Sequence, residues 1–156
     1  MSWNSLFAFD ATGRVGSTYS ATGVTITALV GASAVQNLAT FTGLPVGIYS
    51  VQVSVPLVNA TGIASVPENW IIGASSVSTV SSTLALGSKS IISFPTVMET
   101  ETASSTITTD FILNNTSGTA SIFINSSFTN GTLPNVLLSW NATTPTTATI
   151  VATKLA

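Results

Sequence analysis

The fold is decided by the stretch from Phe41 to Gly62, which reads FTGLPVGIYSVQVSVPLVNATG. From Tyr49 to Val55 every second residue is large and apolar, and the residues between them are serine or glutamine. A period of two is typical of a strand that buries one face against a core. The other face of this strand is polar but carries no charge, so this stretch bears on both the fold and the kind of surface the protein presents.

The same period recurs along the rest of the chain, and no segment shows a convincing helical period. Glycine, proline and asparagine separate the runs, in turn signals such as NATG from Asn59 to Gly62. The candidate strands are Trp3–Phe9, Val24–Val30, Ala34–Phe41, Gly47–Val58, Asn69–Ala74, Ser78–Leu86, Lys89–Phe94, Thr106–Leu113, Thr119–Phe128, Asn135–Trp140 and Thr147–Leu155.

This pattern predicts an all-β fold, an antiparallel β-sandwich of jelly-roll type with about ten strands and little or no helix. We expect a single jelly-roll domain over residues 1–156, because no linker or change in composition divides the chain. The residues expected in the core are Tyr49, Val51, Val53, Val55, Ile122 and Ile124. A structure with a long helix would contradict this prediction.

Charged residues make up only 5% of the 156 residues, whereas about 25% is typical of a soluble chain. Serine and threonine take their place. Burying a hydroxyl group against a neighbouring molecule costs much less than burying an unpaired ion. The composition therefore favours permanent assembly with other subunits over a secreted or glycan-covered domain with a bare Ser/Thr surface.

Several classes of function lack the residues they need. The chain has no cysteine and no histidine, which excludes disulfides, thiolate metal sites and a Ser-His-Asp triad. Three cationic residues cannot follow a phosphate backbone, so we expect no nucleic acid. No stretch of about 20 apolar residues is present, so we expect no membrane insertion. The start, MSWNSLFAFDATGR, has neither the basic region nor the long apolar run of a secretory signal, and we expect none.

The few reactive groups do not form a convincing site. Glu99 and Glu101 would share one face of a strand and could serve a glycosidase or a calcium site, but the context METETASS favours a solvated loop. Ser88 and Lys89 are adjacent in the turn-like context LGSKS, which makes a nucleophile there a weak hypothesis. We therefore predict that the protein is not an enzyme and assign no catalytic, cofactor-binding or metal residue.

Asparagine and tryptophan residues raise two further possibilities. The N-glycosylation pattern occurs at six positions, and we expect most or all of them to be unmodified: Asn59, Asn114, Asn115, Asn125, Asn130 and Asn141. Trp3, Trp70 and Trp140 could form a carbohydrate-binding platform, although a tryptophan near a strand end more often lies in a core or an interface.

The pattern Phe-x-x-Leu-Pro-x-Gly-x-Tyr-x-Val-x-Val-x-Val from Phe41 to Val55 resembles the central strand of C1q/TNF-like jelly rolls. The ending TATIVATKLA resembles the closing strand of such domains. Viral minor capsid, spike and fibre proteins use similar jelly rolls with charge-poor surfaces. The segment LPVGIYSVQV also resembles the core strand of prealbumin-like adhesin modules. The resemblance implies a fold and a context, and it carries over no site residues.

Together these observations predict a structural virion protein: a minor capsid, cement, spike or fibre subunit located in the virion. Its expected partners are copies of itself, with a homotrimer favoured over a pentamer or a lattice, and other capsid proteins. The alternative is a cell-surface adhesin, or a carbohydrate- or receptor-binding β-sandwich module. Large buried interfaces on several sides would favour the first hypothesis, and bare Ser/Thr faces the second.

Overall fold

The computed structural model describes residues 13–23, 25–26, 28–29, 35–57, 59–61, 68–78, 86–94, 105–116, 118, 121–128, 137–139 and 146–156. In this part of the chain there are fourteen strands and no helix. The strands are β1 (Thr18–Ser20), β2 (Thr22–Gly23), β3 (Thr25–Ile26), β4 (Ala28–Leu29), β5 (Gln36–Thr42), β6 (Gly47–Leu57), β7 (Asn59–Thr61), β8 (Glu68–Ser75), β9 (Lys89–Phe94), β10 (Ser105–Asn115), β11 (Ser121–Phe128), β12 (Leu137–Ser139), β13 (Thr146–Thr147) and β14 (Thr149–Lys154).

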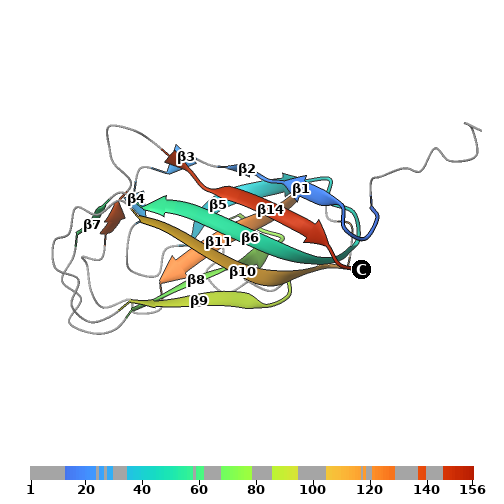
Figure 1. The fold of residues 1–156 in the computed structure, drawn as a ribbon. Coiled ribbons are helices and arrows are strands. Elements are labelled where there is room, and N and C mark those ends of the chain that lie inside the picture. The colour runs from blue at the N-terminus through green and yellow to red at the C-terminus, as the bar shows by residue number, and fades with distance from the viewer. Residues whose placement is uncertain are drawn as a thin grey trace, which may run out of the picture.

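Two antiparallel sheets pack against each other and form a β-sandwich (Figure 1). The first, called here the β6 sheet, has the strand order β1-β14-β6-β10. The second, the β11 sheet, has the order β2-β5-β11-β8-β9. The pairing is nested along the chain: β1 pairs with β14, β5 with β11, β6 with β10 and β8 with β9. Two small additional sheets, β4-β12-β7 and β13-β3, complete the described strands.

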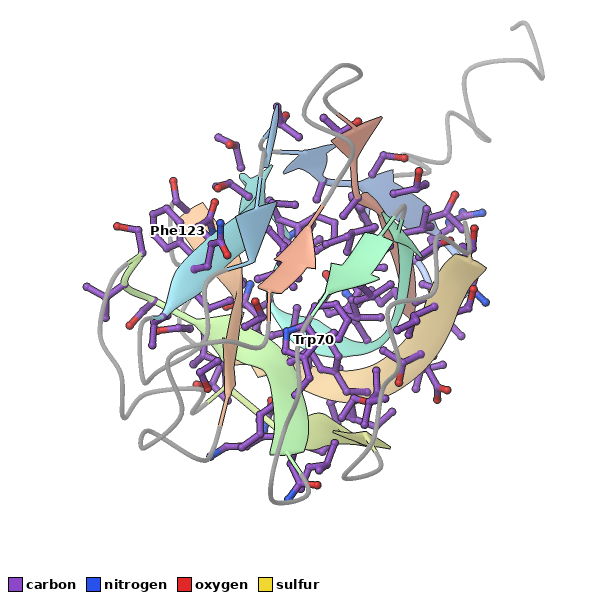
Figure 2. All side chains as sticks on the ribbon, turned by 90° about the vertical axis from the view of Figure 1, so that its left-hand side faces the viewer. Trp70 and Phe123 are labelled. Atoms are coloured by element: carbon purple, nitrogen blue, oxygen red, sulfur yellow. The ribbon has the colours of Figure 1, made fainter. Side chains whose placement is uncertain are left out.

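The core lies between the two sheets, where the alternation predicted it. Tyr49, Val51, Val53 and Val55 of β6 are fully buried, and Ile122 and Ile124 of β11 face them from the other sheet. Trp70 of β8 lies among them, and Figure 2 shows it inside the sandwich. Full burial stabilises the fold by about 1.5–3 kcal/mol for each large apolar side chain. The predicted core residues are confirmed.

A β-bulge interrupts the pairing of β5 with β11 between Ile124 and Asn125. The side chain of Asn37 covers it: its Nδ2 donates to the carbonyl of Ala39 at 3.0 Å and to Oδ1 of Asn125 at 3.1 Å. Asn125 Nδ2 in turn donates to the carbonyl of Val77 at 2.9 Å, in the segment that follows β8. These amides satisfy main-chain groups that a bulge leaves unpaired, which is why a buried asparagine is tolerated there.

Most of the predicted strands exist within one to three residues of their expected bounds, and Lys89–Phe94 coincides with β9. Three predictions were wrong or incomplete. Val24–Val30 was predicted to be one strand, but its described residues form β3, which pairs with β13, and β4, which pairs with β12. NATG was predicted to be a turn, but Asn59–Thr61 is strand β7, which pairs with β12. The short strands β1 and β2 were not predicted, because two or three residues are too few to show a period. Trp3–Phe9 and residues 79–85 lie outside the described part of the chain.

The chain itself closes one edge of the sandwich. β1 belongs to the β6 sheet, and after Ala21 the chain continues as β2 in the β11 sheet. The Ala21 N–H donates to the carbonyl of Ile150 at 3.0 Å, which holds this corner against β14. Among the described residues, this crossing pairs β1 with β14 and places β2 against Ala39 and Thr40 of β5.

At the opposite edge, the segment Leu86–Ser88 lies against part of β10. The Ser88 N–H donates to the carbonyl of Ile112 at 2.8 Å, and the Asn114 N–H donates to the carbonyl of Leu86 at 3.2 Å. Leu86 also donates its N–H to Ala74 of the β11 sheet at 3.1 Å, so this segment joins the two sheets. Ser90 and Thr109 add a hydrogen bond between their hydroxyl groups.

Candidate assembly surface

The outward face of the β6 sheet is almost without charge. Alternation along the four strands places the residues that do not enter the core on this surface, which we call the neutral face. Asp110 is its one charged member among the described residues. The neutral face consists of Thr18 and Ser20 of β1, Ile48, Ser50, Gln52 and Ser54 of β6, Thr106, Thr108, Asp110, Ile112 and Asn114 of β10, and Thr149, Val151 and Thr153 of β14.

Exposed apolar side chains gather at the end of this sheet where β6 begins. The group, called here the apolar strip, is Val15, Val46, Ile48, Ile112 and Leu155. Leu155 lies beside Ile48, whose carbonyl accepts its N–H at 2.7 Å. Ile112 lies opposite Ser50, so it is a diagonal neighbour of Ile48, at a distance of about 7–8 Å. Val15 precedes Gly16, whose N–H donates to the carbonyl of Lys154. An exposed group of this kind is a typical interaction surface.

The loop between β5 and β6 supports the apolar strip from below. The carbonyl of Pro45 accepts hydrogen bonds from the Tyr49 hydroxyl at 2.7 Å and from Asn115 Nδ2 at 3.0 Å. Asn115 Nδ2 also donates to the carbonyl of Leu44 at 2.8 Å, and Leu44 itself is buried. These contacts explain the Leu-Pro-x-Gly-x-Tyr order. The leucine side chain is buried in the core, and the proline carbonyl accepts the hydrogen bond that the tyrosine hydroxyl donates.

Glycine is required at position 47 for steric reasons. A Cβ there would lie 2.5 Å from the carbonyl oxygen of Ala156 and 2.6 Å from Cε of Lys154. The absence of a side chain lets residues 155 and 156 pair with the start of β6, where the Ile48 N–H donates to Ala156 at 2.8 Å. Leu155 is thereby held in the apolar strip.

Two tyrosines fill the interior below this loop. The rings of Tyr19 and Tyr49 meet edge to face, with their centroids 5.8 Å apart. The Tyr19 hydroxyl accepts the N–H of Gly13 at 2.7 Å, and Lys154 Nζ donates to the carbonyl of Gly13 at the same distance. Burial raises the pKa of the Tyr49 hydroxyl above its ordinary value of 10.0, with a further contribution from Tyr19. Lys154 therefore ends at a main-chain carbonyl and adds no charge to the neutral face.

The candidate residues from the sequence are dispersed. Trp70 is fully buried and is a core residue, not part of a surface platform. Ser88 Oγ accepts the N–H of Ile112 at 2.8 Å, so this hydroxyl belongs to the closed part of the β10 edge. Lys89 is exposed at the start of β9. Trp3, Trp140, Glu99 and Glu101 lie outside the described residues.

Two of the six asparagines in glycosylation patterns are buried and cannot carry a glycan in this fold. Asn115 and Asn125 are 1% and 0% exposed, and the Nδ2 atom of each donates to main-chain carbonyls. A glycan cannot be attached to an amide nitrogen in that position, whereas Asn114 is exposed. The side chain of Asn59, together with Asn130 and Asn141, is outside what the structure describes.

The outward face of the β11 sheet differs from the neutral face. Ile91 of β9 is exposed there and lies opposite the half-buried Ile71 of β8, and Phe123 of β11 is half-buried on the same face (Figure 2 labels Phe123). The main-chain segment at Val77 lies against Asn125 on this face. Lys89, two residues before Ile91 on β9, is exposed and adds a charge to this face. The neutral face has more exposed apolar side chains, and it is therefore the stronger candidate for a contact with another molecule.

In the described ranges, no three His, Cys, Asp or Glu side chains form a group that could hold a metal ion. The same part of the chain contains no helix long and apolar enough to cross a membrane. A scan against protein-family models gives no match, and no curated protein is significantly similar to the chain in sequence. A functional assignment therefore has to start from the surface itself.

The apolar strip was not recognised from the sequence. A signal existed, because Ile48 and Ile112 occupy outward positions of strands whose inward positions are already apolar. Ile48 and Ile112 are neighbours only because of the register of β6 with β10. Leu155 is beside Ile48 only because residues 155 and 156 pair with β6, and a single sequence shows neither pairing.

Proposed function

We propose that this chain is a structural subunit that assembles with copies of itself through the neutral face, and that the assembly is part of a virion. The observation that carries the proposal is the apolar strip beside a strand face with one charged residue. A partner that covers this surface removes five exposed apolar side chains from water and buries hardly any ions. The protein would act by binding other subunits and not by catalysis.

The nested strand order supports a finer description of the fold. β1 pairs with β14, and the pairs β5–β11, β6–β10 and β8–β9 lie successively inside it along the chain. This arrangement results when a long hairpin folds over into two sheets. We propose that the sandwich is a jelly roll, the architecture common among capsid and spike proteins. A closed homotrimer is the favoured state. Each subunit has one apolar strip at the end of its sheet, and a threefold axis beside that strip would bring three strips together. A capsid, cement, spike or fibre role is compatible with such a trimer.

The test is the mass of the protein in solution. Multi-angle light scattering at micromolar concentration should give a multiple of 15.9 kDa, with a trimer expected from the neutral-face contact alone. Ile48→Lys places a charge in the centre of the apolar strip and should weaken association at least tenfold, because burying Ile48 contributes about 1.5–3 kcal/mol. Ser76→Lys, at an exposed position outside the neutral face, is the matched control and should leave the mass unchanged.

Electron microscopy separates the structural role from the alternative. Negative staining of the assembled protein should show repeating rings, shells or rods. A folded monomer at all concentrations would overturn the proposal, and binding of that monomer to a glycan array would establish the adhesin or carbohydrate-binding alternative instead.

A further inference from the structure

Within the part of the chain that the structure describes, the outer edge of β10 has main-chain partners over only half its length. Ile112 and Asn114 direct their main-chain groups away from β6, toward Leu86 and Ser88. Main-chain groups point to the same side at every second residue, and the register with β6 is unbroken, so Thr106, Thr108 and Asp110 face the same edge. Among the described residues, no strand or main-chain group pairs with these three on that side, and all three are exposed.

The chemistry of this open edge defines the partner it fits. It presents alternating N–H donors and C=O acceptors at the spacing of a β-ladder, and the complement of such a row is another extended strand. Its side chains are two threonines and one aspartate. None is an apolar anchor, so an added strand would be selected through main-chain hydrogen bonds and electrostatics.

We infer that the open edge of β10 pairs with the open edge of β10 in a second copy, antiparallel, about a twofold axis at Thr108. The inference rests on the proposed function for the identity of the partner. In this register Thr108 faces Thr108 of the second copy, and Thr106 faces Asp110 in both directions. Three facing pairs provide about six main-chain hydrogen bonds and join the two β6 sheets into one continuous sheet.

Charge favours this register over its alternatives. The two Asp110 carboxylates lie four residues apart along the ladder, or about 13 Å, beyond the screening length of about 8 Å at physiological salt. Each carboxylate faces a threonine, whose hydroxyl can donate to it. A parallel arrangement with equal numbers opposite, or an antiparallel one centred on Asp110, would place two carboxylates side by side and is disfavoured.

Single-cysteine variants test the contact directly, because the chain contains no cysteine of its own. At Thr108 the two Cα atoms would be about 5.5 Å apart, within the range that a disulfide spans. Mild oxidation of Thr108→Cys should give a covalent dimer at least ten times faster than Ser76→Cys, the control at an exposed position outside the neutral face. Equal rates, or no dimer from Thr108→Cys in a protein that is otherwise oligomeric, would overturn the inference.

Thr108→Pro supplies a second readout. It removes the outward N–H while the hydrogen bonds of β10 to β6 involve the alternate residues, so the far-ultraviolet circular dichroism should match that of the parent chain. The association constant of the twofold contact should fall at least tenfold. If Thr108→Pro associates like the parent while Ile48→Lys dissociates, the edge contact fails and the proposed function stands. If the parent chain is monomeric at all concentrations, both fail.

Discussion

The two edges of the β6 sheet are closed in different ways. At the β1 edge the chain passes from one sheet into the other, and the Ala21 N–H fixes this corner to Ile150 of β14. At the β10 edge, among the residues that the structure describes, the segment Leu86–Ser88 pairs with the half of the strand near Ile112 and Asn114. One edge is therefore held by the continuous chain between β1 and β2, while the other depends on a few close contacts between Leu86–Ser88 and β10.

The largest effect is expected from Gly87→Ala. Gly87 has φ of 111°, and a Cβ there would overlap the carbonyl oxygen of Ile112 and lie 3.0 Å from the Asn114 nitrogen. The substitution should lower the free energy of unfolding by more than about 3 kcal/mol, measured by urea denaturation at one fixed protein concentration.

Gly43→Ala is the control for this variant. Gly43 also has a positive φ, 69°, but a Cβ there meets nothing within 4 Å. Its cost should be only about 1 kcal/mol, which comes from the backbone conformation alone. Equal losses for the two variants would show that the close approach of Gly87 to β10 is not what seals this edge.

Gly23→Ala makes the corresponding change at the β1 edge. A Cβ at Gly23 would lie 2.9 Å from the carbonyl of Ala148 and 3.2 Å from Cβ of Thr147, without a left-handed backbone. We expect a loss of about 1–3 kcal/mol in the free energy of unfolding. A loss larger than that of Gly87→Ala would mean that the covalently closed edge is the more sensitive of the two.

Tyr49→Phe changes a residue that has contacts toward both edges of the β6 sheet. Tyr19 of β1 contacts its ring, and Asn115 of β10 donates to the same acceptor as its hydroxyl, the Pro45 carbonyl. The Pro45 carbonyl keeps Asn115 as a donor, so the loss in stability should be about 1 kcal/mol.

The same variant has a pH signature. Because the pKa of Tyr49 is raised in the fold, the unfolded chain loses its phenolic proton first as the pH increases. The contribution of this group to stability is therefore complete below pH 10.0 and is lost above it. Urea denaturation from pH 8 to 11 should show a shallower decline for Tyr49→Phe than for the parent chain. Identical slopes would contradict the burial of this hydroxyl.

Ser88→Ala should have the smallest effect, about 0.5–1 kcal/mol, because water can replace the exposed hydroxyl that accepts the Ile112 N–H. Hydrogen exchange should accelerate at the Ile112 amide and stay unchanged at Asn114, whose acceptor is the main chain of Leu86. Equal acceleration at both amides would indicate that the whole segment detaches.

Much of the fold could be predicted because its signals are local. The alternation from Tyr49 to Val55 identifies both the strand and its buried face, and the fully buried side chains confirm it. β1 and β7 could not be predicted in the same way. Each has three residues, and each exists because of a distant partner, β14 and β12 respectively, which local propensity does not encode.

The candidate surface was only half predictable. The lack of charge is a property of composition and can be seen in the sequence, but the site where assembly would occur depends on register. Asn115 and Asn125 illustrate the limit in the other direction. Their sequence pattern is that of a surface glycosylation site, yet the loop after β5 and the bulge in β11 require buried amides at those positions. The three residues of a glycosylation pattern do not show which main-chain carbonyls need a buried amide as a hydrogen-bond donor.

The pairing of β1 with β14 also constrains how the protein folds. Thr18 pairs with Thr153, and β14 lies between β1 and β6 within the sheet, so the β6 sheet cannot be completed until β14 has been synthesised. Closing such distant pairs carries a large entropic cost and predicts folding on the scale of milliseconds to seconds. Until β14 pairs with β6, one edge of β6 has unpaired main-chain groups, a state prone to aggregation. The nested order therefore makes completion of the β6 sheet depend on the synthesis of β14, and favours a chain that is protected from aggregation until then.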